Sequence, residues 1–221
     1  AIVMRADSFA GGWRVPAEPI NDSAIHTRGL GMVYSPGLFA RKKVGLDNLD
    51  LDVPRGSIYG YLGHNGAGKT TLIKILLGIV RKSGGSAKVL GHDAGSMNAR
   101  REIGYLPENH RIPRHLTANT ALEYYGSLSG MSLSRIRTER TRLLDLVGLK
   151  GREKERVAGY SKGMLQRLGL AQAMLHRPKL VILDEPTAGM SGEETTNTIT
   201  LMKRLAHELG LTILFCEHDV E

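Results

Sequence analysis

The stretch GHNGAGKTT at positions 63–71 constrains the fold of this chain more than any other. It fits the pattern G-x-x-x-x-G-K-[ST], in which glycines let the backbone curl around phosphate oxygens. The apolar segment SIYGYL (57–62) precedes it, and TLIKILLGIV (71–80), with apolar residues at helical spacing, follows it. This order predicts a buried strand, a phosphate-binding turn and a helix whose positive N-terminal end faces the ligand.

Each residue type in this turn has a chemical role toward a nucleoside triphosphate. Successive backbone N–H groups point at phosphate oxygens, Lys69 reaches the terminal phosphates, and the Thr70 hydroxyl is a ligand for Mg²⁺. We therefore predict that this part of the chain binds a nucleoside triphosphate. The residues expected to contact it here are Gly63, His64, Asn65, Gly66, Ala67, Gly68, Lys69, Thr70 and Thr71.

Short apolar runs alternate with helical patterns along the rest of the chain. EIGYL (102–106), LVIL (180–183) and LTILFC (211–216) are expected strands, and the last two are typical of central parallel strands covered by helices on both faces. The segments 117–149 and 193–209 have apolar residues at helical spacing, and the first of them predicts a helical subdomain. The sequence therefore predicts an α/β fold.

Acidic and imidazole side chains follow two of these strands. Asp184 and Glu185 come directly after LVIL, and His218 comes shortly after LTILFC. Ligands of open α/β sheets bind at the carboxyl ends of the strands, so these side chains are expected beside the phosphates. Asp184 would hold Mg²⁺, Glu185 would activate an attacking water, and His218 would contact the γ-phosphate or that water. For His218, a structural or merely exposed role remains equally open.

Composition narrows the possible partners without choosing among them. The net charge of +8 suits a nucleotide, a nucleic acid or a membrane surface. The aromatic content of 5% argues against an aromatic platform for stacking nucleic-acid bases. The single cysteine, Cys216, excludes an internal disulfide and is expected to be a buried thiol. No apolar stretch approaches the about 20 residues that span a bilayer, so any membrane span is expected from another chain.

The first residues have a composition unlike the rest. Residues 1–26 are rich in Gly, Pro and small polar residues, and we expect a loose leader there. The leader has no basic segment followed by an apolar one, so a secretory signal is not expected. The chain begins with Ala1, which suggests a partial or processed sequence.

Five motifs in order resemble the ATP-binding cassette (ABC) ATPases: the phosphate-binding loop, GYLPE, YSKGM, LDEP and EHD. The resemblance covers about 27–221 and implies ATP and Mg²⁺ as cofactors. It implies an α/β fold with a P-loop NTPase core, a mostly parallel sheet, an N-terminal antiparallel β subdomain and an inserted helical subdomain at about 109–175. Members of the family continue beyond the position of EHD, so we expect a C-terminally truncated domain.

The motif YSKGM (160–164) matches the family's signature, usually written LSGGQ. The resemblance implies that Ser161 and Gly163 cap the ATP of a second ABC subunit, so that two chains sandwich two nucleotides. A serine donor, backbone N–H groups and a helix dipole all favour a γ-phosphate. Lys162 replaces a glycine, and we expect its ammonium to add to nucleotide binding across the dimer. Ser191 stands where most members carry aspartate, in the loop that links the two sites.

Further roles follow from the family by position. Tyr34 matches an aromatic residue that stacks on adenine, although a core tyrosine is nearly as plausible. Glu108 stands where many members have a glutamine that contacts Mg²⁺ and senses the transport partner, and a glutamate still suits that hard cation. Asp184, Glu185 and His218 match the metal-binding carboxylate, the general base and the histidine switch.

The resemblance implies an ATPase subunit that energises export through integral membrane permease subunits, at the cytoplasmic face of the membrane. EPTAGMS and EHDV look more like amino-acid importers, so import remains an alternative. A soluble ABC ATPase acting on ribosomes or DNA is a third possibility. We expect no nucleic-acid partner, because there is no second cassette, heptad run or cysteine cluster. A small-molecule P-loop kinase would leave YSKGM unexplained.

Overall fold

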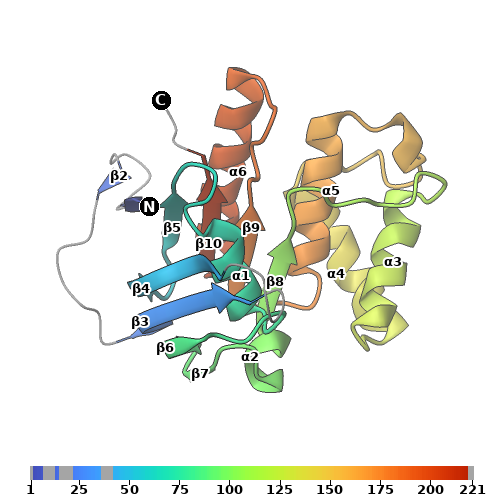
Figure 1. Cartoon of the computed structure of the whole chain (residues 1–221). Coiled ribbons are helices and arrows are strands. Elements are labelled where there is room, and N and C mark those ends of the chain that lie inside the picture. The colour runs from blue at the N-terminus through green and yellow to red at the C-terminus, as the bar shows by residue number, and fades with distance from the viewer. Residues whose placement is uncertain (1, 7–12, 15–21, 36–41, 219–221) are drawn as a thin grey trace.

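The computed structural model describes residues 2–6, 13–14, 22–35 and 42–218 (Figure 1). A six-stranded sheet has the order β2-β1-β5-β10-β9-β8, and a four-stranded sheet has the order β4-β3-β6-β7. The strands are β1 Ile2–Ala6, β2 Trp13–Arg14, β3 Ser23–Tyr34, β4 Lys43–Pro54, β5 Ile58–Leu62, β6 Gly84–Val89, β7 His92–Asp93, β8 Ile103–Leu106, β9 Leu180–Asp184 and β10 Thr212–Glu217. The helices are α1 Lys69–Leu76, α2 Met97–Arg101, α3 Ala118–Leu128, α4 Leu133–Leu146, α5 Lys162–Met174 and α6 Gly192–Leu209, with a 3₁₀ turn at Val157–Gly159.

The centre of the larger sheet is parallel, as predicted. β5 pairs with β10, β10 with β9, and β9 with β8, all in parallel. Alternate side chains of one strand enter two different cores: Ile58 and Leu62 enter one, Tyr59 and Tyr61 the other. Both faces of these strands are therefore buried, which explains why they are continuously apolar in sequence.

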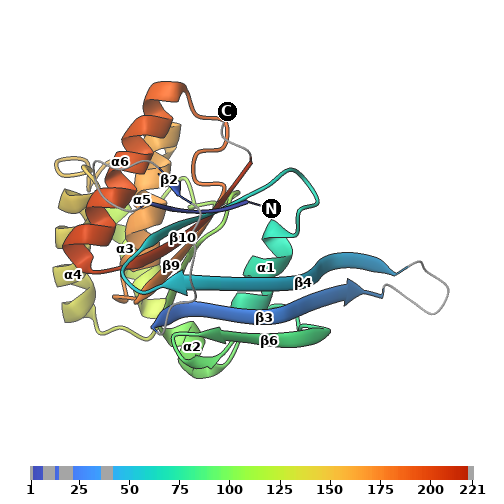
Figure 2. The same cartoon turned by 90° about the vertical axis from the view of Figure 1, so that its left-hand side faces the viewer.

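Helix α1 lies between the two sheets, as Figure 2 shows. Its buried residues Leu72, Ile73 and Leu76 share one core with the four-stranded sheet and with one face of the six-stranded sheet. Helices α3, α4, α5 and α6 contribute to the core on the opposite face. The predicted helix over 71–80 ends early, at Leu76. The chain turns at Gly78, whose φ of 73° is unfavourable for other residues.

Within the range predicted as a helical subdomain, about 109–175, α3 and α4 pack against each other and against α5 (Figure 1). Thr117 and Ser132 accept hydrogen bonds from backbone N–H groups and so begin the two helices. The Glu139 carboxylate is 2% exposed and accepts hydrogen bonds from Arg142 and Arg177. This ion pair fixes α4 to the turn that leads into β9.

Two short strands lie within the residues expected as a loose leader. β1 pairs antiparallel with β5 and also pairs with β2, and β3 begins at Ser23, ahead of the expected boundary at residue 27. Five residues are too few to show strand periodicity, and the exposed edge of β5 gives them backbone partners that composition cannot reveal. Within the described ranges, no helix combines the length and the apolar composition needed to cross a bilayer.

Candidate nucleotide-binding site

The turn between β5 and α1 has a backbone that only glycine adopts easily. Gly66 and Gly68 have φ values of 90° and 87°. A Cβ on Gly68 would lie 2.6 Å from the Gly45 carbonyl oxygen, so a side chain is excluded by contact as well as by conformation. These two glycines produce the curl that the motif predicted.

The start of α1 is open to an anion. Its N-cap is Gly68, no side chain accepts a hydrogen bond from the first turn, and no acidic residue lies in that turn. The first N–H groups of a helix lack partners within the helix and carry a partial positive charge. A phosphate can therefore bind there without displacing a protein group.

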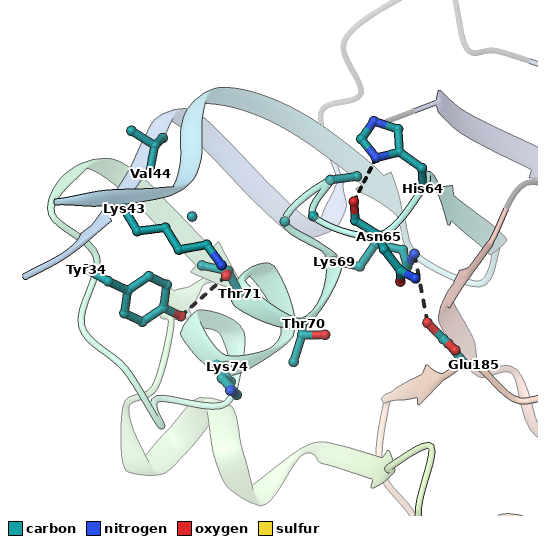
Figure 3. A pocket seen from close by; sticks show the side chains of 14 residues that line it. Tyr34, Lys43, Val44, His64, Asn65, Lys69, Thr70, Thr71, Lys74 and Glu185 are labelled. Carbon is teal, nitrogen blue, oxygen red and sulfur yellow. Dashed lines mark hydrogen bonds and ion pairs between the residues drawn. The ribbon is translucent and has the colours of Figure 1, made fainter. Parts of the chain in front are cut away.

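This turn opens into a cavity of about 400 Å³, shown in Figure 3. The residues that line it are Tyr34, Lys43, Val44, Gly45, His64, Asn65, Gly66, Ala67, Gly68, Lys69, Thr70, Thr71, Lys74 and Glu185. The cavity thus brings together most of the residues predicted to contact the nucleotide. Gly63, Glu108, Asp184 and His218 lie outside this lining, as do Ser161 and Gly163.

Tyr34 forms one wall of the cavity. Its hydroxyl lies 3.3 Å from the Thr71 hydroxyl, and its ring packs where a Cβ on Gly45 would come within 2.6 Å (Figure 3). The ring therefore stands beside the phosphate-binding helix and reaches the cavity. Stacking of this ring on adenine stays a prediction.

Lys69, Glu185 and His218 form one continuous set of polar contacts. The Lys69 side chain is 6% exposed, and its ammonium donates to the Gly63 carbonyl oxygen. The same ammonium lies 3.8 Å from Glu185 Oε1, which lies 3.0 Å from His218 Nε2. Glu185 has a φ of 49°, a strained value for a residue with a side chain. The three predicted catalytic residues are therefore neighbours.

Asp184 ends β9 and is largely buried. Burial raises the pKa of its carboxyl, and the negative charges of Glu185 and Glu108 raise that pKa further. A hydrogen bond from Tyr105 and the charge of Lys69 oppose the rise without cancelling it. The raised pKa shows that negative charge is crowded at the end of β9, and a divalent cation would relieve this repulsion.

Mg²⁺ fits this donor set. In the part of the chain that the structure describes, no group of three or more His, Cys, Asp or Glu side chains is arranged to hold a metal ion alone. Mg²⁺ commonly binds through one or two protein oxygens, water and substrate phosphates instead of a complete protein cage. Thr70 on the cavity wall and Asp184 beside Lys69 provide such oxygens.

Two polar residues of the site were missed by sequence reasoning. Tyr105 hydrogen bonds to Asp184, and burial together with that carboxylate raises the tyrosine pKa to about 12. Glu217 is 7% exposed, and its carboxylate accepts hydrogen bonds from the Thr187 N–H at 2.8 Å and the Thr187 hydroxyl at 2.6 Å. A charged residue at the end of a buried strand was the available signal for Glu217.

The signature residues stand at the start of α5. The Ser161 hydroxyl oxygen accepts from the Met164 N–H at 3.2 Å, so Ser161 is the N-cap. Its O–H remains able to donate to a ligand, and no acidic residue lies in the first turn. The Lys162 ammonium, expected to reach a nucleotide across a dimer, donates here to the Ala188 carbonyl oxygen of the same chain.

Known proteins are similar to this chain over most of its length. The family model described as ABC transporter matches residues 46–188. An uncharacterized ABC transporter ATP-binding protein of Synechocystis is 41% identical, over 99% of this chain and 66% of its own length. The daunorubicin/doxorubicin resistance ATP-binding protein DrrA of Streptomyces peucetius is 37% identical, over 86% of this chain and 56% of its own. The methionine import ATP-binding protein MetN of Rhizobium meliloti is 36% identical, over 80% and 51%.

A solved structure shares the fold. The chain of cbiO1 from Clostridium perfringens, described as part of the ABC transporter complex cbiONQ, matches with a TM-score of 0.79 and 25% identity. The match covers 90% of this chain and 80% of cbiO1. The present chain spans 66% or less of the curated relatives named above. The family match over more than half of the chain, together with the shared fold, shows that this chain belongs to the ABC transporter family and carries its ATP-binding domain.

Proposed function

We propose that this chain binds and hydrolyses ATP as one subunit of an ABC transporter and energises export of a substrate through separate membrane subunits. One observation supports this role above all. In a cavity of about 400 Å³, the turn that ends at Gly68, the Lys69 ammonium and the Glu185 carboxylate face the same space. The first two suit phosphates, and the carboxylate suits activation of water.

Each residue has a separable task in this reaction. Lys69 and the N–H groups at the start of α1 hold the phosphates, while Thr70, Asp184 and Glu108 hold Mg²⁺. Bound Mg²⁺ supplies charge neutralisation at the phosphate oxygens. Glu185 accepts the proton of the attacking water, and His218, at 3.0 Å from Glu185, keeps that carboxylate oriented.

The signature turn acts on a second subunit. Ser161 and Gly163 lie outside the cavity lined by their own phosphate-binding turn, which supports a role toward the ATP of another ABC subunit. Closure of two chains around two ATP molecules then drives the integral membrane permease subunits, and hydrolysis reopens the pair. A subunit with this role is expected at the cytoplasmic face of a membrane.

The arguments for export or import come from the similar proteins and from the sequence motifs. Likeness to a drug-resistance protein supports export, with YSKGM and GYLPE as the motifs that favour it. Import is the second candidate, because the methionine import protein is nearly as similar and EHDV favours it. A soluble ATPase that acts on ribosomes or DNA is less favoured than an exporter or an importer. The sequence has neither the heptad run nor the cysteine cluster expected of such proteins.

Light scattering of the Glu185→Gln variant tests this function. Without the general base, ATP should be bound and not hydrolysed, so a dimer should appear on adding ATP and Mg²⁺ and be absent without them. The control adds Ser161→Arg, which places a bulky cation in the signature turn and should abolish the dimer. A monomer under all conditions would contradict the sandwich arrangement.

A further inference from the structure

We propose that Lys162 and Glu217 are positioning residues that hold the segment 187–191 between the hydrolytic residues of this chain and its own signature turn. This inference rests on the proposed function, because the signature turn is taken to serve the ATP of a second subunit. In such a dimer the segment couples the two ATP sites. In this chain the coupling depends on two side chains and not on an aspartate at position 191.

Glu217 fixes the first end of the segment. Its buried carboxylate accepts both the N–H and the hydroxyl of Thr187, at 2.8 and 2.6 Å. Its own carbonyl oxygen accepts from the Gly63 N–H at 3.2 Å, where the phosphate-binding turn begins. The next residue, His218, contacts Glu185 at 3.0 Å. Two successive residues, Glu217 and His218, therefore contact the phosphate turn, the general base and the segment.

The segment itself forms a tight turn. The Ala188 N–H donates to the Glu185 carbonyl oxygen at 3.1 Å, and the Met190 N–H donates to the Thr187 carbonyl oxygen at 3.1 Å. Gly189 has a φ of 62°. These bonds tie the position of Ala188 to the backbone of Glu185, so a shift of Glu185 moves the Ala188 carbonyl.

Lys162 fixes the second end. Its ammonium donates to the Ala188 carbonyl oxygen, and a Cβ on Gly189 would lie 2.7 Å from that ammonium. The absence of a side chain on Gly189 therefore makes room for the contact. Lys162 is the first residue of α5, directly between Ser161 and Gly163. A displacement of the segment is thus transmitted to the turn that caps the second ATP.

Two departures from the family pattern coincide in this arrangement. Lys162 replaces a glycine that could make no side-chain contact, and Ser191 replaces the usual aspartate. Ser191 is occupied as the N-cap of α6, where it accepts from the Glu194 N–H at 3.3 Å. Lys162 thus connects the segment 187–191 to the signature turn, a connection that Ser191 does not make.

The test compares Lys162→Met with wild type in steady-state ATP hydrolysis. Methionine keeps an unbranched side chain and removes the ammonium. Two coupled sites give a Hill coefficient of up to about 2, so wild type is expected well above 1 and Lys162→Met close to 1. ATP affinity of the isolated monomer should change by less than about twofold, because Lys162 does not line the cavity of its own chain.

Two further variants separate coupling from stability. Lys162→Arg keeps a donor cation and should restore the Hill coefficient, while Glu217→Ala removes both bonds to Thr187 and should lower it. Lys150→Met is the matched control, because Lys150 pairs with Asp145 on an exposed surface and should behave as wild type. Unchanged cooperativity in Lys162→Met would overturn the coupling role. A Glu185→Gln protein without an ATP-dependent dimer would overturn the proposed function itself, which Lys162→Met alone cannot do.

Discussion

Replacing Lys69 with methionine should separate two roles of one buried charge. The side chain is 6% exposed, so water screens its ammonium little. A hydrogen bond to a charged group contributes about 1.5–3 kcal/mol, and each 1.4 kcal/mol is tenfold in affinity. Loss of the bond to a terminal phosphate should therefore weaken ATP binding by roughly 10- to 100-fold.

The same change should alter stability without nucleotide. Lys69 lies 3.8 Å from Glu185, a separation at which two charges attract by about 4 kcal/mol at an effective dielectric of 20. The cost of burying the ammonium offsets part of this attraction, and removing one partner of a buried pair destabilises by about 3 kcal/mol. Asp184 determines the pH dependence. The Asp184 pKa lies above the ordinary 3.8, and it should rise further when the Lys69 charge is removed. Ionising Asp184 in the folded protein then costs more in Lys69→Met than in wild type. The loss of stability in Lys69→Met should therefore grow as pH rises through that pKa.

Calorimetric titration with Mg-ATP measures the affinity, and thermal unfolding at about pH 4 and pH 7 measures the stability. Lys74→Met is the matched control, because Lys74 lies on the same helix, lines the same cavity and is exposed. Lys74→Met should change the ATP affinity and the thermal stability far less than Lys69→Met does. Equal affinities of the Lys69 variant and wild type would refute the placement of the phosphates, and a stability deficit independent of pH would refute the electrostatic reasoning.

Two further predictions concern buried carboxylates. Tyr105→Phe removes the hydroxyl bonded to Asp184, so the Asp184 pKa should rise. The acid limb of the pH profile of ATP hydrolysis should then move to higher pH. Mg²⁺ affinity, measured in a metal titration, should fall about 10-fold. Glu139→Ala should cost about 2 kcal/mol at pH 7 in urea unfolding. Burial alone would raise the Glu139 pKa, but bonds from Arg177 and Arg142 hold it below 4.5, so the difference from wild type should disappear as pH falls through that pKa. A deficit that does not shrink as pH falls below 4.5 would contradict the ion-pair explanation.

The sequence predicted those parts of the fold in which local pattern and burial agree. β9 and β10 are buried on both faces and therefore continuously apolar, and the glycines of the phosphate turn have the positive φ values that their motif implies. The long strands β3 and β4 were anticipated only through the family. Their register shifts at several points, which breaks the alternation that identifies a strand.

Contacts between distant residues account for what sequence reasoning missed. Tyr105 meets Asp184 because β8 and β9 pair in a register that puts Tyr105 opposite Ile182, on the same face as Asp184. Lys162 turns toward Ala188 because α5 begins beside the segment that follows Glu185. Neither pairing has a local signal, since each depends on how the sheet and helices assemble.

The strand order of the six-stranded sheet also bears on how the protein is made. β5 leads into the phosphate turn, yet its parallel neighbour is β10. The Gly63 N–H donates to the Glu217 carbonyl oxygen, which belongs to β10. During synthesis the turn therefore leaves the ribosome long before the strand that supports it. Contacts between residues so far apart in sequence form late. A nascent chain should therefore acquire tight nucleotide binding only after β10 has left the ribosome.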